Sequence, residues 1–324
     1  MPLRLGIAGF GRVALHSYTP ALSAISDFEV SVIAERASAA RALAARSFPR
    51  ARLLSDAFEA CRTEQVDAWL IALPPAQHFV TAQAALVHGA HVYVEKPMTL
   101  QLADAERLVE IGRSSGRVAM VGYVGRFARP YVELKRRLAG LPLPGGVRVQ
   151  TRLTFDEAKL PTWKRAPATG GGAIRDIAIH HADLVRFLFD TEIVQVRARV
   201  AARRVAVDSV EVELRLGNSV TVAGFFSSAA RACDSVTVTH GALRLHAQRA
   251  RYRSPLLRLA HRAVRRLTGA AAPDPAFVAC FASFAAAIRR GETAAQPGLE
   301  DGARGVAFVR AAERSIQLGE WAEV

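Results

Sequence analysis

A carboxylate and an imidazole that stand four residues apart are the clearest candidates for acid–base chemistry in this chain. They are Asp176 and His180, in the stretch GGGAIRDIAIH over residues 170–180. If the stretch is helical, both side chains lie on one face, and the carboxylate can orient the imidazole and stabilise its charged form. Histidine is also the side chain best suited to proton transfer near neutral pH. A helix with a solvated polar face would show the same spacing.

A lysine with a second potential role follows a short apolar run, in the sequence HVYVEKP of residues 91–97. The run at 92–94 has strand composition, and Pro97 prevents a strand from continuing as a normal ladder. Lys96 is therefore expected at the carboxyl end of a strand, the edge where ligands bind in open α/β sheets. A solvated Glu95–Lys96 ion pair on a loop is the alternative interpretation.

A glycine-rich turn near the start of the chain predicts a dinucleotide site. After an expected strand at 3–8, the pattern G-x-G-x-x-A is filled by Gly9, Phe10, Gly11, Arg12, Val13 and Ala14. Gly9 permits a tight turn, Gly11 lets the backbone approach a pyrophosphate, and Ala14 allows close helix packing. A helix at about 12–24 would direct the positive end of its dipole at the phosphates.

Cofactor choice is expected to depend on the end of a second strand, at about 28–34. Glu35 follows it, 26 residues after Gly9, where an acid can accept hydrogen bonds from the adenosine ribose hydroxyls. This position favours NAD. Arg36, with Ser38 and Arg41 nearby, could instead hold a 2′-phosphate, so NADP stays open as the alternative cofactor.

Strands and helices alternate through the first 122 residues. Further strands are expected near 51–54, 67–73 and 118–121, and helices near 56–62, 76–88 and 102–114. The alternation predicts an α/β domain with a doubly wound parallel sheet, in which Leu73 and Pro74, like Gly9 and Lys96, lie at carboxyl strand ends. His78, just after Pro74, is expected beside the cofactor; a position on the helix face is the alternative.

From residue 123 the pattern changes to strands with short connections, which indicate hairpins. The strands are expected near 147–155, 193–201, 210–216, 220–226, 235–239 and 242–246, and helices near 131–138, 275–289 and 299–318. The chain is therefore predicted to have two domains, 1–122 and 123–324. The second is expected to be α+β, with a large, mostly antiparallel open sheet.

Composition narrows the possible partners. Lysine and arginine total 43 against 29 acidic residues, a net charge of +14, but the arginines are scattered and no nucleic-acid motif accompanies them, so no nucleic-acid partner is predicted. The three cysteines lie too far apart for a disulfide framework or a zinc site. Neither a signal peptide nor a transmembrane segment is recognised, and a cytoplasmic protein is expected.

One stretch is strongly basic. Residues 244–267 contain eight arginines, two histidines and no acid, and from Pro255 their apolar residues recur at helical spacing. This predicts a basic amphipathic helix. Acidic headgroups, or a phosphorylated or nucleotide-linked sugar, would suit it, and a solvated basic face over a packed apolar stripe is the alternative.

Taken in order, these motifs resemble the glucose–fructose oxidoreductase / inositol dehydrogenase (Gfo/Idh/MocA) family over nearly the whole chain. The resemblance rests on G-x-G-x-x-A, the acid after the second strand, Glu95-Lys96-Pro97, Gly-Arg-Phe at 125–127, and GGG-x-x-x-D-x-x-x-H. It implies a Rossmann domain, a C-terminal domain whose open sheet often serves oligomerisation, and a nicotinamide near the Glu95-Lys96 turn. It also implies that Lys96, Asp176 and His180 match the family's active site. Two departures, Ala178 in place of a frequent glycine and His181-Ala182-Asp183 in place of Asp-x-Asp, are expected to reshape the substrate pocket.

This resemblance implies NAD(P)-dependent hydride transfer to or from a secondary alcohol or ketone of a sugar, polyol or nucleotide-sugar-like compound. His180 would be the base, Asp176 would orient it, and Lys96 would donate a hydrogen bond to the developing alkoxide. The substrate-binding candidates are Tyr123, Arg126, Trp163 and Lys164, although Trp163 also suits core packing; no metal is expected. Two alternatives stay open: an NAD-dependent glycoside hydrolase of the same family, and a non-catalytic cofactor-binding protein whose basic helix contacts an anionic partner.

Overall fold

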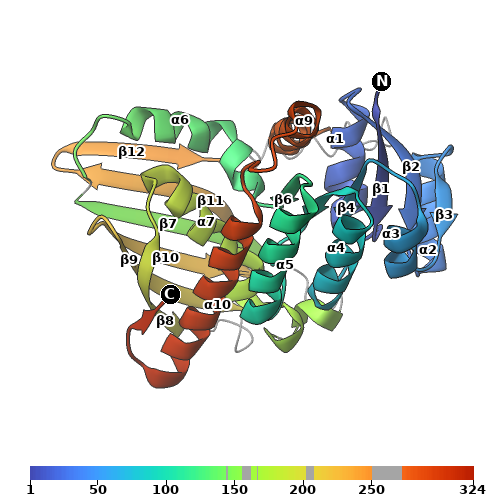
Figure 1. Cartoon of the computed structure of the whole chain (residues 1–324). Coiled ribbons are helices and arrows are strands. Elements are labelled where there is room, and N and C mark those ends of the chain that lie inside the picture. The colour runs from blue at the N-terminus through green and yellow to red at the C-terminus, as the bar shows by residue number, and fades with distance from the viewer. Residues whose placement is uncertain (144, 155–161, 166, 202–207, 250–271) are drawn as a thin grey trace. The chain divides into compact units, whose positions relative to one another are not determined.

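The computed structural model describes residues 1–143, 145–154, 162–165, 167–201, 208–249 and 272–324 (Figure 1). The chain divides into two compact units. One comprises residues 1–124 with the described part of 261–303, and the other comprises the described parts of 125–260 and 304–324. The basic helix predicted from Pro255 lies outside the described residues. Within the described ranges, no helix has the length and hydropathy needed to cross a membrane.

Six parallel strands form the sheet of the first unit, in the order β3-β2-β1-β4-β5-β6. Their bounds are β1 Leu3–Ala8, β2 Phe28–Ala34, β3 Arg52–Leu54, β4 Ala68–Ile71, β5 His91–Val94 and β6 Ala119–Val121. This is the strand order of a doubly wound dinucleotide-binding sheet, so the predicted Rossmann architecture is confirmed. Because the strands are parallel, the carboxyl ends of β2, β1, β4 and β5 meet at one edge.

Helices connect these strands (Figure 1). They are η1 Ala14–Tyr18, α1 Thr19–Ser23, α2 Ser38–Ser47, α3 Ala57–Thr63, η2 Pro75–Gln77, α4 His78–Val87 and α5 Leu102–Ser115. A helix from the later part of the chain, α9 Pro275–Arg290, belongs to the same unit. The sequence interpretation missed α2, although its sequence is rich in alanine, the strongest helix former. The predicted helix at 12–24 forms, but its turn η1 is π-helical. Pro20 has no N–H for the carbonyl four residues earlier, and its ring crowds that carbonyl, which widens the turn.

Seven strands form the sheet of the second unit, in the order β12-β11-β7-β10-β9-β8-β13. Their bounds are β7 Gly146–Thr154, β8 Ile193–Val200, β9 Ser209–Leu216, β10 Thr221–Ser227, β11 Ala229–His240, β12 Leu243–Gln248 and β13 Ala322–Glu323. Only β10 and β7 pair in parallel, so the predicted mostly antiparallel sheet is confirmed. The short strand β13 was not predicted, since two residues show no alternation.

Helices cover one face of this second sheet. α7 Ile179–Phe189 and α10 Leu299–Leu318 contribute Val185 and Phe308, which line the same apolar space as Val149, Val212 and Phe226 of the strands. α6 Arg129–Leu138 lies beside α7 and β12. Since side chains alternate along a strand, the residues between these apolar positions point to the opposite face.

The two central strands of the first sheet pack through a glycine. A Cβ added at Gly6 in β1 would stand 2.5 Å from the indole of Trp69 in β4, which is fully buried. We therefore expect Gly6→Ala to lower the free energy of unfolding by about 1–3 kcal/mol, as overpacking does, in urea titrations. Gly11→Ala is the control, because a Cβ there would meet no atom within 4 Å. A Gly6→Ala variant as stable as the wild type would contradict this packing.

Candidate active site

The glycine-rich loop after β1 has room for a phosphate group. Gly9 has a φ of 89°, and a Cβ there would stand 2.8 Å from the carbonyl oxygen of Ala72, so this turn requires glycine. A Cβ on Gly11 would meet no atom within 4 Å, so the space beside that position is open. The helix that begins at Arg12 and includes Val13 directs its N-terminal N–H groups to the same side. These residues fit the pyrophosphate of a dinucleotide.

Glu35 ties the glycine-rich loop to the end of β2. Its Oε2 accepts a hydrogen bond of 2.7 Å from the N–H of Phe10, and its Oε1 accepts one of 2.7 Å from the N–H of Ala37. An ionised carboxylate has about four acceptor sites, so capacity for ribose hydroxyls is left. Arg41 Nη1 donates to the carbonyl oxygens of Glu35 and Arg36, while the side chain of Arg36 is exposed.

Lys96 lies two residues beyond the end of β5, with a half-buried side chain. Its backbone N–H is 3.2 Å from Oε2 of Glu95, whose Oε1 accepts a hydrogen bond of 2.5 Å from the hydroxyl of Tyr18. Burial, and then the charge of Glu95, raise the pKa of Tyr18 well above its usual value, so Tyr18 stays a donor. The Glu95 carboxylate is therefore held on the inner side of this turn.

His78 connects two of the strand ends. It is the first residue of α4 and only 1% exposed. Its Nδ1 lies 2.9 Å from the carbonyl oxygen of Pro97, and its Nε2 lies 2.8 Å from that of Leu73, in the turn that continues to Pro74. Burial lowers the pKa of His78 more than these carbonyls raise it, so the ring is neutral near neutral pH. Both ring nitrogens are thus directed at backbone.

Asp176 and His180 lie on one continuous helix of the second unit. A π-helical turn, Ile174–Ala178, contains Asp176 and leads directly into α7, which carries His180; such turns are frequent at functional sites. The Asp176 carboxylate accepts hydrogen bonds of 3.0 and 2.8 Å from Lys164 Nζ. Lys164 Nζ also lies 5.2 Å from the ring centre of Trp163. The structure therefore brings together one predicted catalytic residue and two predicted substrate residues.

A second ion pair lies further along this helix. Arg126 donates two hydrogen bonds, of 2.9 and 2.6 Å, to Asp183, whose side chain is 2% exposed. Lys164 thus binds the carboxylate in the π-helical turn, and Arg126 binds the carboxylate in α7, so two cations hold this helix at two positions along its length. Bidentate pairing with a buried carboxylate fixes the guanidinium of Arg126 to the helix.

The predicted catalytic residues are divided between the two units. Lys96 belongs to the first, together with Tyr123, which is 1% exposed just beyond β6. Asp176 and His180 belong to the second. Their convergence on one substrate stays a prediction.

Sequence reasoning missed a buried polar network beneath the second sheet. Asp234 in β11 accepts hydrogen bonds from the Tyr131 hydroxyl at 2.5 Å and from His181 Nε2 at 3.2 Å, and Thr151 Oγ1 lies 2.9 Å from the same nitrogen. Burial favours a raised pKa for Asp234, but the bonds from His181 and Tyr131 and the charge of Arg249 hold the pKa well below its usual range. Burial, and then Asp234, raise the pKa of Tyr131. The residues of this network lie far apart in the sequence, so no local sequence pattern could predict that they are in contact.

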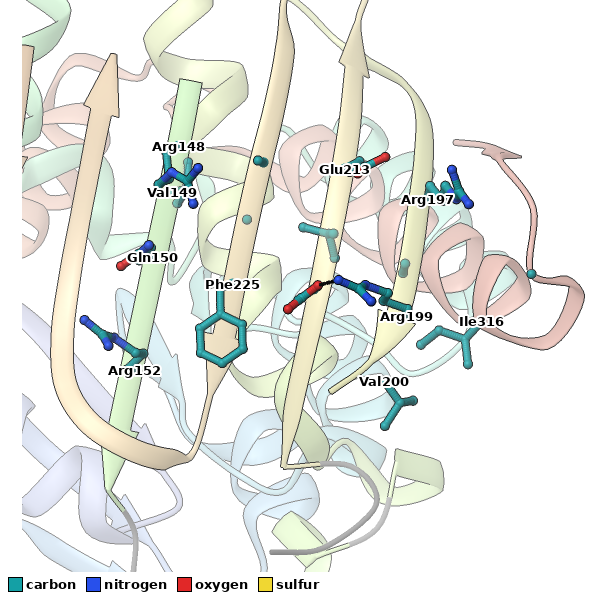
Figure 2. A pocket seen from close by; sticks show the side chains of 16 residues that line it. Arg148, Val149, Gln150, Arg152, Arg197, Arg199, Val200, Glu213, Phe225 and Ile316 are labelled. Carbon is teal, nitrogen blue, oxygen red and sulfur yellow. Dashed lines mark ion pairs between the residues drawn. The ribbon is translucent and has the colours of Figure 1, made fainter. Parts of the chain in front are cut away.

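A hollow of about 830 Å³ lies on the face of the second sheet opposite to α7 (Figure 2). Figure 2 shows Phe225 on its floor between charged side chains of the neighbouring strands. The arginines of β8 pair across the ladder with glutamates of β9, Arg199 with Glu211 by an ion pair. Arg152 of β7 has a buried Nε with no hydrogen-bond acceptor among the described residues. None of the predicted catalytic residues lines this hollow.

Two family models match the chain. One, described as an oxidoreductase family with an NAD-binding Rossmann fold (GFO_IDH_MocA), matches residues 3–123, and the GFO/IDH/MocA C-terminal domain matches residues 146–251. All three cysteines of the chain are free: Cys61 lies in the first matched region, Cys233 in the second, and Cys280 after both.

Individual relatives are more distant. The chain is 31% identical, over 59% of its length, to the dTDP-3,4-didehydro-2,6-dideoxy-alpha-D-glucose 3-reductase of Streptomyces violaceoruber, and 30% identical, over 62%, to the inositol 2-dehydrogenase of Acidothermus cellulolyticus. These matches span 56% and 58% of those proteins, so the chain matches little more than half of their length. The structure of scyllo-inositol dehydrogenase from Lactobacillus casei with NAD(H) and scyllo-inositol matches with a TM-score of 0.82 at 17% identity, covering 100% of this chain and 99% of that one, which shows the same fold.

The depressed pKa of Asp234 makes the stability of the protein pH-dependent. Its carboxylate stabilises the fold above the unfolded pKa of about 3.9, and this contribution is lost as pH falls towards the lower folded pKa. We expect Asp234→Asn to cost about 3 kcal/mol near neutral pH, as for a broken buried ion pair. The difference from wild type in urea titrations should shrink below pH 4 or so. Asp190→Asn, at a carboxylate 78% exposed, is the control; a pH-independent difference for Asp234→Asn would refute the assignment.

Proposed function

Since this chain belongs to the GFO/IDH/MocA oxidoreductase family, we propose that it transfers a hydride between a nicotinamide dinucleotide and a secondary alcohol or ketone. The substrate class we propose is a sugar, a polyol or a nucleotide sugar. The observation that carries the proposal is the turn after β5, where a half-buried Lys96 stands at the same sheet edge as the open glycine-rich loop. The names of the relatives, a dTDP-sugar reductase and an inositol dehydrogenase, support this substrate class.

The cofactor would occupy the edge formed by β2, β1, β4 and β5. Gly9, Phe10, Gly11, Arg12 and Val13 would hold the pyrophosphate, and Glu35 would accept the ribose hydroxyls, which favours NAD. The exposed Arg36 leaves NADP as the alternative. The remaining predicted contacts are Leu73, Pro74, His78, Glu95 and Lys96, of which the buried His78 acts through the backbone.

In oxidation, the bound nicotinamide supplies the hydride acceptor. His180 takes the hydroxyl proton, and Lys96 donates a hydrogen bond to the oxygen as negative charge develops on it. Asp176 orients His180, and Lys164 fixes the Asp176 carboxylate through their ion pair. Tyr123, Arg126, Trp163 and Lys164 stay our candidates for shaping the substrate pocket. In reduction the same groups act in reverse, with His180 as the acid.

We further propose that the face of the second sheet that carries the hollow packs against the same face of another copy. β7 carries Arg148 and Arg152 and no acid, whereas β9 carries Glu211 and Glu213, so two antiparallel copies would place opposite charges together. A carboxylate from the partner would also satisfy the buried Nε of Arg152. A location in the cytoplasm, with its reducing surroundings, stays part of the proposal.

The catalytic assignment is tested with a panel of sugars, polyols and nucleotide sugars, followed by NADH or NADPH absorbance. Lys96→Ala and His180→Ala should each lower kcat by roughly 10²-fold or more, the scale of a lost proton-transfer or oxyanion-stabilising group. His180→Ala should keep its affinity for NADH in fluorescence titrations. The control is His88→Ala, at an exposed histidine of the first unit.

Near-normal turnover of either variant would exclude the assignment. Release of free sugar without net reduction of the cofactor would favour the glycoside hydrolase instead. Strong binding to anionic vesicles, combined with an absence of turnover on every alcohol and ketone, would favour the non-catalytic cofactor-binding protein.

The proposed interface between two copies is tested by a substitution that introduces one charged side chain into the hollow. Phe225→Lys, in the centre of the hollow, should reduce the mass measured by light scattering from a multiple of the chain to a single chain, because the added ammonium would be buried among the arginines that line the hollow. Val87→Glu, at an apolar side chain 73% exposed on the first unit, should leave the mass unchanged. A wild-type protein that is monomeric at all accessible concentrations would rule the interface out.

A further inference from the structure

The two turns that follow β4 and β5 share one side chain. β4 and β5 are adjacent parallel strands, paired from Ala68 with His91 to Ile71 with Val94. Beyond the last pair the ladder ends and the chains turn away. The carbonyl oxygens of Leu73 in one turn and Pro97 in the other lie 2.8 and 2.9 Å from the two ring nitrogens of His78.

We propose that His78 is a positioning residue, whose ring holds the Lys96–Pro97 turn against the Leu73–Pro74 turn and so sets the place of Lys96. The inference rests on the proposed function, because only there does the place of Lys96 matter for the reaction. His78 touches neither substrate nor cofactor in this role. It acts through the backbone, from a position that is 1% exposed.

The two turns stay beside the ring of His78 because the carbonyl groups of Leu73 and Pro97 need a hydrogen-bond donor. The contact with Pro97 is buried and the contact with Leu73 is partly buried, and a carbonyl oxygen withdrawn from water is destabilised when it lacks a hydrogen bond, so both turns are stabilised beside the ring. A neutral imidazole carries a single N–H, so it donates to one of the two carbonyl oxygens at a time, and a change of tautomer transfers the hydrogen bond to the other. Since the ring is rigid, its width fixes the separation of the two turns.

A second contact restrains Lys96 from the other side. Its backbone N–H lies 3.2 Å from Glu95 Oε2, and Glu95 is held by the Tyr18 hydroxyl. Lys96 is therefore held at its own N–H and, through Pro97, at the next carbonyl. The charge of Lys96 also acts on His78, as it lowers the pKa of the ring, which agrees with their proximity.

The test uses the scarcity of lysine in this chain, which has only Lys96, Lys135, Lys159 and Lys164. Methylation with ¹³C-labelled formaldehyde retains the positive charge and gives each lysine a separate NMR signal. The signal of Lys96 is assigned from its absence in Lys96→Arg. In His78→Phe, which keeps an aromatic ring but no nitrogen, we expect that signal to shift and broaden, while those of Lys135 and Lys164 stay in place.

The matched control is His91, at the start of β5, the strand whose other end leads to Lys96. His91 Nδ1 accepts a hydrogen bond of 2.9 Å from the N–H of Val118, so His91→Phe also removes a ring-to-backbone contact of the first unit. It should lower stability in urea titrations but leave the Lys96 signal unchanged. A role for His78 in core packing alone would affect stability in both variants and the Lys96 signal in neither.

An unchanged Lys96 signal in folded His78→Phe, or an equal change in His91→Phe, would overturn the proposal. If His78→Phe does not fold, His78→Gln replaces it, because its amide N–H reaches one carbonyl and should give a smaller shift. The measurement requires neither turnover nor cofactor. Failure of the proposed function would instead appear as absent oxidation and reduction with an intact Lys96 signal response.

Discussion

The candidate site depends on the parallel pairing of four adjacent strands. Because β2, β1, β4 and β5 run in one direction, residues that lie far apart in the sequence reach the same edge of the sheet. The glycine-rich loop, Glu35, the Leu73–Pro74 turn and Lys96 all stand there. Backbone hydrogen bonds fix the register of these strands, so the edge is a rigid platform on which cofactor chemistry can be arranged.

Side chains then connect the loops of that edge to one another. Glu35 ties the glycine-rich loop to β2, and His78 links the turns after β4 and β5. Glu95 and Tyr18 hold the inner side of the Lys96 turn. Glu35, His78 and Glu95 contact backbone groups that the sheet ladder no longer pairs, which is the usual requirement where strands end in a buried environment.

In the second unit, the candidate catalytic side chains lie on a helix whose carboxylates pair with cationic side chains. This helix carries Asp176, His180 and Asp183, and the cations Lys164 and Arg126 bind the two carboxylates. It also carries His181, which joins the buried Asp234 network under the sheet. The helix is thus held by these ion pairs and by this network, and this arrangement explains how the unusual His181-Ala182-Asp183 sequence is accommodated.

The sequence by itself determined the alternation of strands and helices in the first unit, the mostly antiparallel character of the second sheet and the helix that carries Asp176 and His180, because periodicity and turn residues are local signals. It did not reveal α2, since alanine-rich sequence lacks a strong apolar period, nor the π-helical turns. Only the tertiary structure decided that Lys164 pairs with Asp176, that Arg126 pairs with Asp183, and that His78 lies between two carbonyls. Such contacts join residues whose separation along the chain carries no pattern, and they form only when packing brings buried charges and backbone groups within hydrogen-bonding distance.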